Sequence, residues 1–226
     1  MRRKLKVLFI STIIIIAVIG IIVVAEKILE KNDSGIKEII ENIAQKEETT
    51  TADPFLLSDD IIKDYLTPNE YSRPGKELKE VNAIVVHYVG NPGTTAAQNR
   101  NYFENLKDTH ATSASSHYII GLEGEIIQCV PLNEISYASN NRNKDTIAIE
   151  CCHPDETGQF TTATYKSLVK LVAALCRTYD LDPETGIIRH YDVTGKYCPL
   201  YYVNHEDEWY GFKLDVKAEL NAVNTK

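Results

Sequence analysis

"NAIVVHY", at residues 82–88, is the stretch of this sequence that most directly predicts the fold. The run is short, apolar and rich in β-branched residues, which is the pattern of a buried strand. It ends in a histidine and a tyrosine, and "NPGTT" at 91–95 then supplies the Asn, Pro and Gly of a turn. We therefore expect a buried strand that carries His87 to its end, where a loop begins.

Further strands and helices alternate along the chain beyond this strand. "SHYIIG" at 116–121 and "GEIIQCV" at 124–130 predict a hairpin, and "DTIAIECC" at 145–152 and "GIIRHY" at 186–191 predict two more strands. Helices are expected over 96–108, with Thr94 or Thr95 as the cap, over 162–179, and over 206–222. This alternation predicts an α/β layered domain.

The helix expected over 162–179 has one apolar face. Its residues at helical spacing should pack against the sheet: Tyr165, Leu168, Val169, Val172, Leu175, Cys176 and Tyr179.

The amino-terminal region has a different texture. Residues 7–25, "VLFISTIIIIAVIGIIVVA", carry no charge, and as a helix they would extend for about 28 Å, the thickness of a bilayer core. The basic residues before this run favour a cytoplasmic amino terminus: Arg2, Arg3, Lys4 and Lys6. We expect a single-pass cell-membrane anchor with the remainder outside the cytoplasm. The alternative is a signal peptide cleaved after Ala25, which gives a secreted protein.

These shifts predict four segments. Residues 1–6 form a cytoplasmic basic tail, 7–25 the transmembrane anchor, 26–60 an extracytoplasmic spacer, and 61–226 the globular domain. The spacer is rich in Glu, Lys and Thr and has too little apolar material to close a core.

Charge and cysteine content narrow the possible partners. The formal net charge is −8, and the part beyond the anchor is more acidic still, because four basic residues precede the anchor. Since phosphate binding needs clustered Lys and Arg, we expect no nucleic-acid partner. The five cysteines are an odd number, so at least one should be free or bound to metal. A disulfide between Cys129 and Cys151 is compatible with the pattern but is not required by it.

Three residues form a candidate metal site. His87 and His190 each stand at the end of a predicted strand, and Cys198 follows eight residues after His190. Two imidazoles and a thiolate leave the fourth position of a tetrahedral zinc site open for water or substrate, as in catalytic sites. The chain has neither a C-x-x-C knuckle nor an H-E-x-x-H helix, so the spacing excludes zinc fingers and zincins.

Four sequence words, in order, carry a family resemblance. "IVVHYVGNPG", "SASSHYIIGLEGEIIQCVPL", "DTIAIECCHP" and "IIRHYDVTGKYCP" resemble the type 2 N-acetylmuramoyl-L-alanine amidases, a family that includes phage amidase lysozymes and peptidoglycan recognition proteins. The resemblance covers roughly residues 62–215. It implies a mixed central β-sheet flanked by helices, and zinc held by His87, His190 and Cys198 in an open groove. It also implies cleavage of the amide between N-acetylmuramic acid and L-alanine in peptidoglycan.

Two further residues are candidates for catalysis. Glu150 ends the apolar run "TIAIE", and a carboxylate beside the zinc-activated water can move its proton to the leaving amine. Lys196, two residues before Cys198, can place a positive charge at the developing oxyanion. The resemblance implies a catalytic glutamate and a lysine at these same positions.

Substrate contacts are less sharply marked. Tyr88, Asn91 and His117 are candidates because they lie near expected groove loops, as do Asn140 and Arg142. His117 has an equally good interpretation as a hydrogen-bonded residue inside the hairpin. His153 follows Cys151 and Cys152, but adjacent strand residues point to opposite faces, so these three do not form a metal site.

The residues leave two other functions open. One is a catalytically inactive peptidoglycan-binding module, although the family resemblance associates that state with loss of the cysteine ligand, and Cys198 is present. The other is an amidase that cleaves a different bond of the stem peptide. We expect the protein to be a monomer that contacts peptidoglycan and, through its amino-terminal helix, the membrane.

Overall fold

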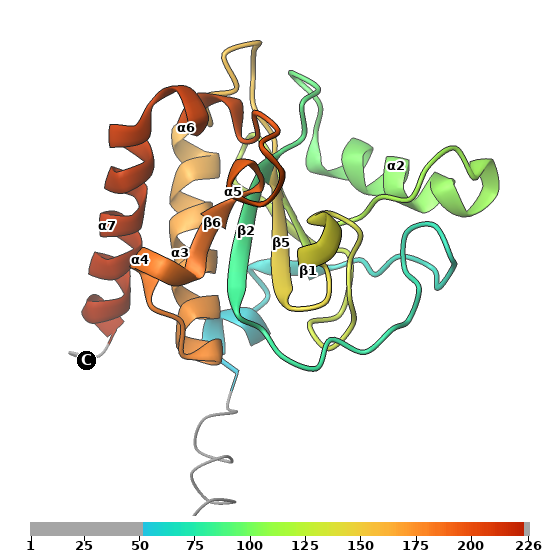
Figure 1. The fold of residues 1–226 in the computed structure, drawn as a ribbon, viewed down its shortest axis with the longest axis horizontal. Coiled ribbons are helices and arrows are strands. Elements are labelled where there is room, and N and C mark those ends of the chain that lie inside the picture. The colour runs from blue at the N-terminus through green and yellow to red at the C-terminus, as the bar shows by residue number, and fades with distance from the viewer. Residues whose placement is uncertain (1–51, 224–226) are drawn as a thin grey trace, which may run out of the picture. The chain divides into compact units, whose positions relative to one another are not determined.

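One mixed sheet of six strands organises the domain, in the order β1-β4-β3-β5-β2-β6 (Figure 1). The structure is a computed structural model, and it describes residues 52–223. All neighbouring strands are parallel except β3 and β4, which form the expected hairpin. The strands are β1 Ile61–Lys63, β2 Ala83–Tyr88, β3 Tyr118–Ile120, β4 Ile126–Gln128, β5 Thr146–Cys151 and β6 Ile187–Arg189. The expected mixed α/β architecture is therefore confirmed.

Helices cover both faces of this sheet. α3 (Thr162–Tyr179) packs on one face with α7 (Glu206–Val223) alongside it, and α2 (Ala96–Thr109) covers the other face (Figure 1). Thr95 caps α2, since its side chain accepts a hydrogen bond from the backbone N–H of Gln98 and the Gln98 side chain accepts one from the backbone N–H of Thr95. The remaining short elements are η1 Pro54–Leu57, η2 Asn140–Arg142, α4 Pro183–Gly186, α5 His190–Thr194 and α6 Leu200–Asn204.

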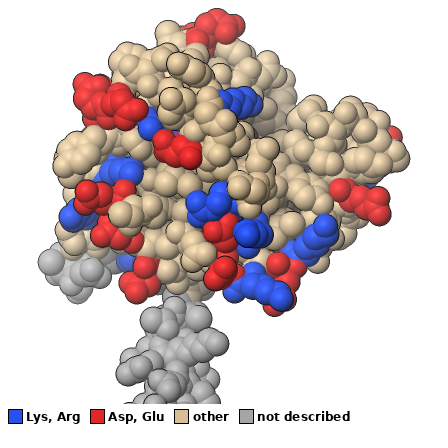
Figure 2. Space-filling view, viewed as in Figure 1, with Lys and Arg blue, Asp and Glu red and all other residues tan. Residues whose placement is uncertain are grey.

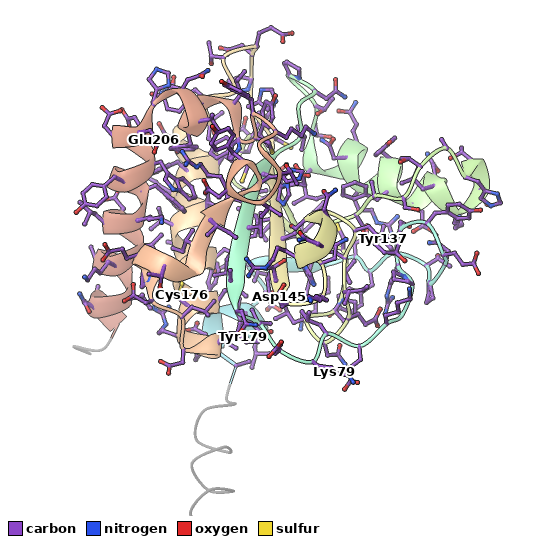
Figure 3. The ribbon with its side chains drawn as sticks, viewed as in Figure 1. Lys79, Tyr137, Asp145, Cys176, Tyr179 and Glu206 are labelled. Atoms are coloured by element: carbon purple, nitrogen blue, oxygen red, sulfur yellow. The ribbon has the colours of Figure 1, made fainter. Side chains whose placement is uncertain are left out.

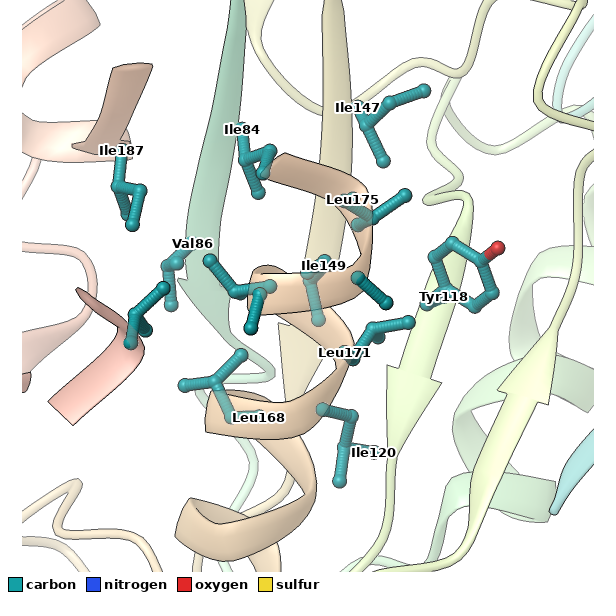
Figure 4. Close-up of a cluster of buried hydrophobic side chains, with 14 of the residues drawn as sticks. Ile84, Val86, Tyr118, Ile120, Ile147, Ile149, Leu168, Leu171, Leu175 and Ile187 are labelled. Atoms are coloured by element: carbon teal, nitrogen blue, oxygen red, sulfur yellow. The ribbon is translucent and has the colours of Figure 1, made fainter. Parts of the chain in front are cut away.

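The main core lies between α3 and the three central strands. Leu168, Leu171 and Leu175 of α3 contact the isoleucines and valine that β2 and β5 direct toward that side (Figure 4). Burying one such side chain contributes about 1.5–3 kcal/mol. Four of the seven residues expected on one helical face are buried: Leu168, Val172, Leu175 and Cys176. Tyr165 instead contacts α7, where its ring lies against that of Phe212 and its hydroxyl donates to Asp215 over 2.6 Å. Leu171 is buried in addition, because it packs on the sheet.

The packed domain begins earlier than the sequence predicted. Leu56, in the expected spacer, is buried in the main core. Asp53 forms an ion pair with Arg177 of α3, and its backbone N–H donates to Thr178 Oγ1 over 3.1 Å. This end of the expected spacer therefore packs against the domain, because Leu56 is apolar and Asp53 has its ionic partner on α3.

The five cysteines are unpaired. Cys151 packs on the α3 side of the sheet and Cys129 on the α2 side, so the suggested disulfide between them is absent. Cys176 lies on α3, near Tyr179 at the same end of the helix (Figure 3).

The amino-terminal predictions lie outside the described residues. This applies to the basic tail, the membrane anchor and residues 26–51 of the spacer. Between residues 52 and 223, none of the helices is both long enough and apolar enough to span a bilayer.

Candidate metal centre

Three parallel strands bring their carboxyl ends to one edge of the sheet. β2 lies between β5 and β6, and His87 of β2 stands directly beside Glu150 of β5. His190 comes immediately after β6 and begins α5, where the sequence suggested that it would still be in the strand. Because parallel strands end together, residues distant in sequence meet at this edge.

A tight turn returns the chain to the same edge. Gly195 ends α5 in the left-handed conformation, with φ +77°, and the backbone N–H of Tyr191 donates to the carbonyl of Cys198 over 2.9 Å. This turn places the buried Cys198 next to the histidines and leaves Lys196 exposed at its tip.

The three candidate ligands lie together. One ligand atom from each of His87, His190 and Cys198 lies within 4.8 Å of the others, and His87 Nδ1 is 3.8 Å from Cys198 Sγ. Ligand atoms around a tetrahedral zinc ion are about 3.5 Å apart, given metal–ligand distances of about 2.0–2.3 Å. The donor set and its spacing therefore fit a metal ion of this kind after a small contraction.

The protonation of these ligands also suits a metal. Burial lowers the pKa of His87 far below its usual value, with further contributions from His190 and Lys196, and burial and Lys196 lower that of His190. Both imidazoles are therefore neutral near pH 7. Burial raises the pKa of the Cys198 thiol to about 12, partly offset by the backbone N–H of Tyr88 and by Lys196. Metal binding must then displace the thiol proton.

Glu150 provides a carboxylate at the same edge. Its Oε1 lies 3.9 Å from His87 Nδ1, and its Oε2 is buried without a hydrogen-bond partner among the described residues. Burial raises the pKa of this carboxyl to about 8, while the charge of Lys196 acts in the opposite direction. A buried carboxyl oxygen without a protein partner is typical of a group that binds water, a metal or a substrate.

His117 does not lie at this site, which corrects its assignment as a substrate contact. The side chain is fully buried, its Nδ1 accepts from the backbone N–H of Ala148 over 3.0 Å, and its Nε2–H donates to the carbonyl of Glu134 over 2.9 Å. Ser136 Oγ lies 3.1 Å from the same Nδ1. Since both ring nitrogens are occupied and no atom is exposed, His117 ties the hairpin to β5.

The other suggested contacts differ in position. Tyr88 is half-buried at the end of β2, and its ring lies 5.0 Å from that of His153. Asn91 is exposed in the following loop. Asn140 is exposed and contacts His190, whereas Arg142 forms an ion pair with Asp145 over 2.9 Å.

Sequence reasoning missed Ser139, a buried serine whose Oγ lies 3.2 Å from His87 Nε2. No local sequence signal marks it, because its partner is 52 residues away.

The charged side chains on one face are mixed. Lys and Arg lie among Asp and Glu there, without a continuous basic surface (Figure 2). The absence of a nucleic-acid partner stays a prediction.

Comparison with known proteins identifies the family of this domain. A family model described as N-acetylmuramoyl-L-alanine amidase matches residues 77–200. N-acetylmuramoyl-L-alanine amidase BlyA of Bacillus subtilis (strain 168) is 33% identical over 178 residues, which cover 70% of this chain and 47% of that protein. N-acetylmuramoyl-L-alanine amidase CwlL of Bacillus licheniformis is 32% identical, covering 71% and 47%. This chain thus spans about half the length of these curated relatives.

Solved structures show the same fold. The catalytic domain of XlyA superposes with a TM-score of 0.59 at 25% identity, covering 69% of this chain and 98% of that domain. A mutant endolysin from Bacillus subtilis gives a TM-score of 0.58 at 25% identity, covering 69% and 97%.

Proposed function

The chain belongs to the N-acetylmuramoyl-L-alanine amidase family, and on that premise we propose that it is a zinc-dependent hydrolase of peptidoglycan. The bond cleaved is the amide between N-acetylmuramic acid and L-alanine. One observation carries the proposal: two imidazoles, a thiol and a carboxyl meet where three parallel strands end. Such a set serves hydrolysis better than binding alone, because binding does not require a carboxyl with a strongly raised pKa.

His87, His190 and Cys198 would hold the zinc ion. Three protein ligands from two histidines and one cysteine are typical of catalytic zinc and leave a fourth position open. When bound, zinc supplies a Lewis acid that polarises the scissile carbonyl and makes a water molecule easier to deprotonate.

Glu150 would move the proton. Amide hydrolysis places a hydroxyl on the carbonyl carbon, breaks the C–N bond and delivers a proton to the nitrogen. The Glu150 carboxylate accepts the proton of the attacking water and donates it to the departing amine of alanine. Burial raises the pKa of Glu150 to about 8, which keeps both protonation states accessible near neutral pH.

Lys196 would stabilise the negative charge that develops on the carbonyl oxygen. Its positive charge acts to lower the pKa values of four groups of the site: His87, His190, Glu150 and Cys198. Because the side chain is exposed, it can turn toward a substrate carbonyl in an open groove.

The cellular setting is part of this proposal and rests on the amino-terminal sequence. The apolar run at 7–25 would anchor a monomeric enzyme in the cell membrane, with the amidase domain outside. Such a tether would confine hydrolysis to wall layers near the membrane. Cleavage after Ala25 would instead release the enzyme.

Mass spectrometry of digested peptidoglycan tests the reaction. Purified full-length protein in detergent should release stem peptides that begin with a free alanine amine. Chelation should abolish this release, and Glu150→Gln should slow it strongly. Fragments cut at another stem-peptide bond would establish a different amidase. Unchanged muropeptides together with retained binding to the wall would establish the binding module.

A further inference from the structure

The two histidines of the metal centre are each held by a side chain of one short loop. This loop, residues 138–143, precedes β5 and includes η2. We propose that Ser139 and Asn140 are positioning residues that fix the tautomer and ring orientation of His87 and His190 for the metal. The inference rests on the proposed zinc site.

Ser139 sets the first histidine. Its Oγ is 3.2 Å from His87 Nε2, whereas the other ring nitrogen, Nδ1, is the one near Cys198 Sγ and Glu150 Oε1. An imidazole that coordinates through Nδ1 must carry its proton on Nε2, and Ser139 Oγ can accept that hydrogen. Ser139 is fully buried, so bulk water does not compete with it for this contact.

Asn140 sets the second histidine. Its Oδ1 lies 3.4 Å from His190 Nε2, and an amide oxygen only accepts hydrogen bonds. In the proposed arrangement His190 would carry its proton on Nε2 and donate it to Asn140, which would leave Nδ1 for the metal. Asn140 has φ +53°, a conformation that asparagine tolerates better than most residues.

The loop is held by contacts that do not involve the histidines. Asn143 Oδ1 accepts from the backbone N–H of Ala138 over 3.1 Å and from that of Ser139 over 2.6 Å. Thr146 at the start of β5 donates through Oγ1 to the carbonyl of Arg142 over 2.7 Å. The loop is thus anchored to the strand that carries Glu150, so it can impose an orientation on the ligands.

A second buried serine–histidine contact lies away from the candidate ligands and can serve as a control. Ser136 Oγ lies 3.1 Å from His117 Nδ1, and both side chains are buried. Deleting Ser136 therefore removes a buried serine–histidine contact of similar length at a histidine that is not a candidate ligand. It serves as the control for Ser139→Ala.

Zinc affinity and metal-free stability, measured on full-length protein in detergent, test the inference together. The dissociation constant of zinc is obtained by competition with a chromophoric chelator, and the thermal unfolding temperature is obtained with excess chelator. Ser139→Ala should weaken zinc binding about 10- to 100-fold, the usual effect of losing a partner of a metal ligand. Asn140→Gly keeps the positive φ and should weaken zinc binding less than Ser139→Ala does. Asn140→Asp keeps the hydrogen-bond acceptor and should bind zinc as tightly as the wild type. Ser136→Ala should lower the unfolding temperature and leave zinc affinity unchanged.

The outcomes separate this inference from the proposed function. If the wild-type protein does not bind zinc, the metal site itself is wrong and the inference fails with it. If the wild-type binds zinc and both Ser139→Ala and Asn140→Gly bind it equally well, the zinc site stands and the positioning role is wrong. Should Ser139→Ala not fold, the exposed Asn140 decides the question through its Gly and Asp variants.

Discussion

His87 and His117 are both buried in this domain, and both have a pKa below the usual histidine value because of burial. They differ in what surrounds them. His117 uses both ring nitrogens in hydrogen bonds within the protein, whereas Nδ1 of His87 faces a cysteine sulfur and a carboxyl oxygen. Burial and a shifted pKa are therefore common to a structural histidine and a candidate ligand. The two histidines differ in whether Nδ1 is used in a hydrogen bond to the backbone or faces other possible metal ligands.

The sharpest way to break this comparison is to remove the carboxyl beside His87. Glu150→Gln keeps the shape of the side chain but cannot accept a proton, so kcat should fall about 10²- to 10⁴-fold while zinc binding persists. Muropeptide release measured by liquid chromatography gives the rate. The matched control is Glu134→Gln, since Glu134 accepts from His117 only through its carbonyl. Wild-type turnover by Glu150→Gln would exclude Glu150 as the base.

Removing the positive charge near His87 is expected to have the next largest effect. Lys196→Ala should lower kcat about 10²- to 10³-fold, as loss of an oxyanion-stabilising group does, with a smaller change in KM. Steady-state kinetics on solubilised peptidoglycan separates the two parameters. Lys144→Ala, another exposed lysine, should retain full activity. An equal loss in both variants would point to general surface charge.

Lowering the pH tests the structural role of His117. Burial lowers its folded-state pKa to about 4, so the unfolded chain binds the proton first. The contribution of His117 to the free energy of unfolding is therefore complete above pH 6.5. It falls by up to about 3 kcal/mol as the pH falls toward 4. Urea unfolding from pH 7 to 4 measures the loss, and His117→Gln should reduce the pH dependence by that amount. An unchanged pH dependence in His117→Gln would contradict the assignment.

Metal removal gives the smallest expected change. Zinc at one hundred times its dissociation constant should raise the free energy of unfolding by about 2.7 kcal/mol, because only the folded chain presents the site. Calorimetry with zinc and with chelator measures this difference. Cys198→Ala should eliminate the stabilisation, whereas Cys129→Ala should retain it, since Cys129 packs in the apolar cluster beneath α2 and is not one of the candidate ligands. Equal stabilisation in both variants would place the metal elsewhere.

The sequence predicted the elements that carry the site. The apolar run before His87, the run before Glu150 and the helix at 162–179 all appear as expected, because burial of a strand or one helix face imposes a local repeat on the sequence. Residue type made His87, His190 and Cys198 candidate ligands, the family resemblance implied the same three, and the structure brings them together.

Only the tertiary structure decided which side chains support those ligands. Ser139 and Asn140 lie 52 and 50 residues from the histidines they contact, and Asp53 lies 124 residues from Arg177. His117 is fixed inside the domain by β5, which no pattern in its own hairpin indicates. The physical reason is that a hydrogen-bond partner is selected by proximity after strands pair, and strand order leaves no local repeat in the sequence. The sequence by itself thus determined the elements and the candidate ligands, and the fold determined their partners.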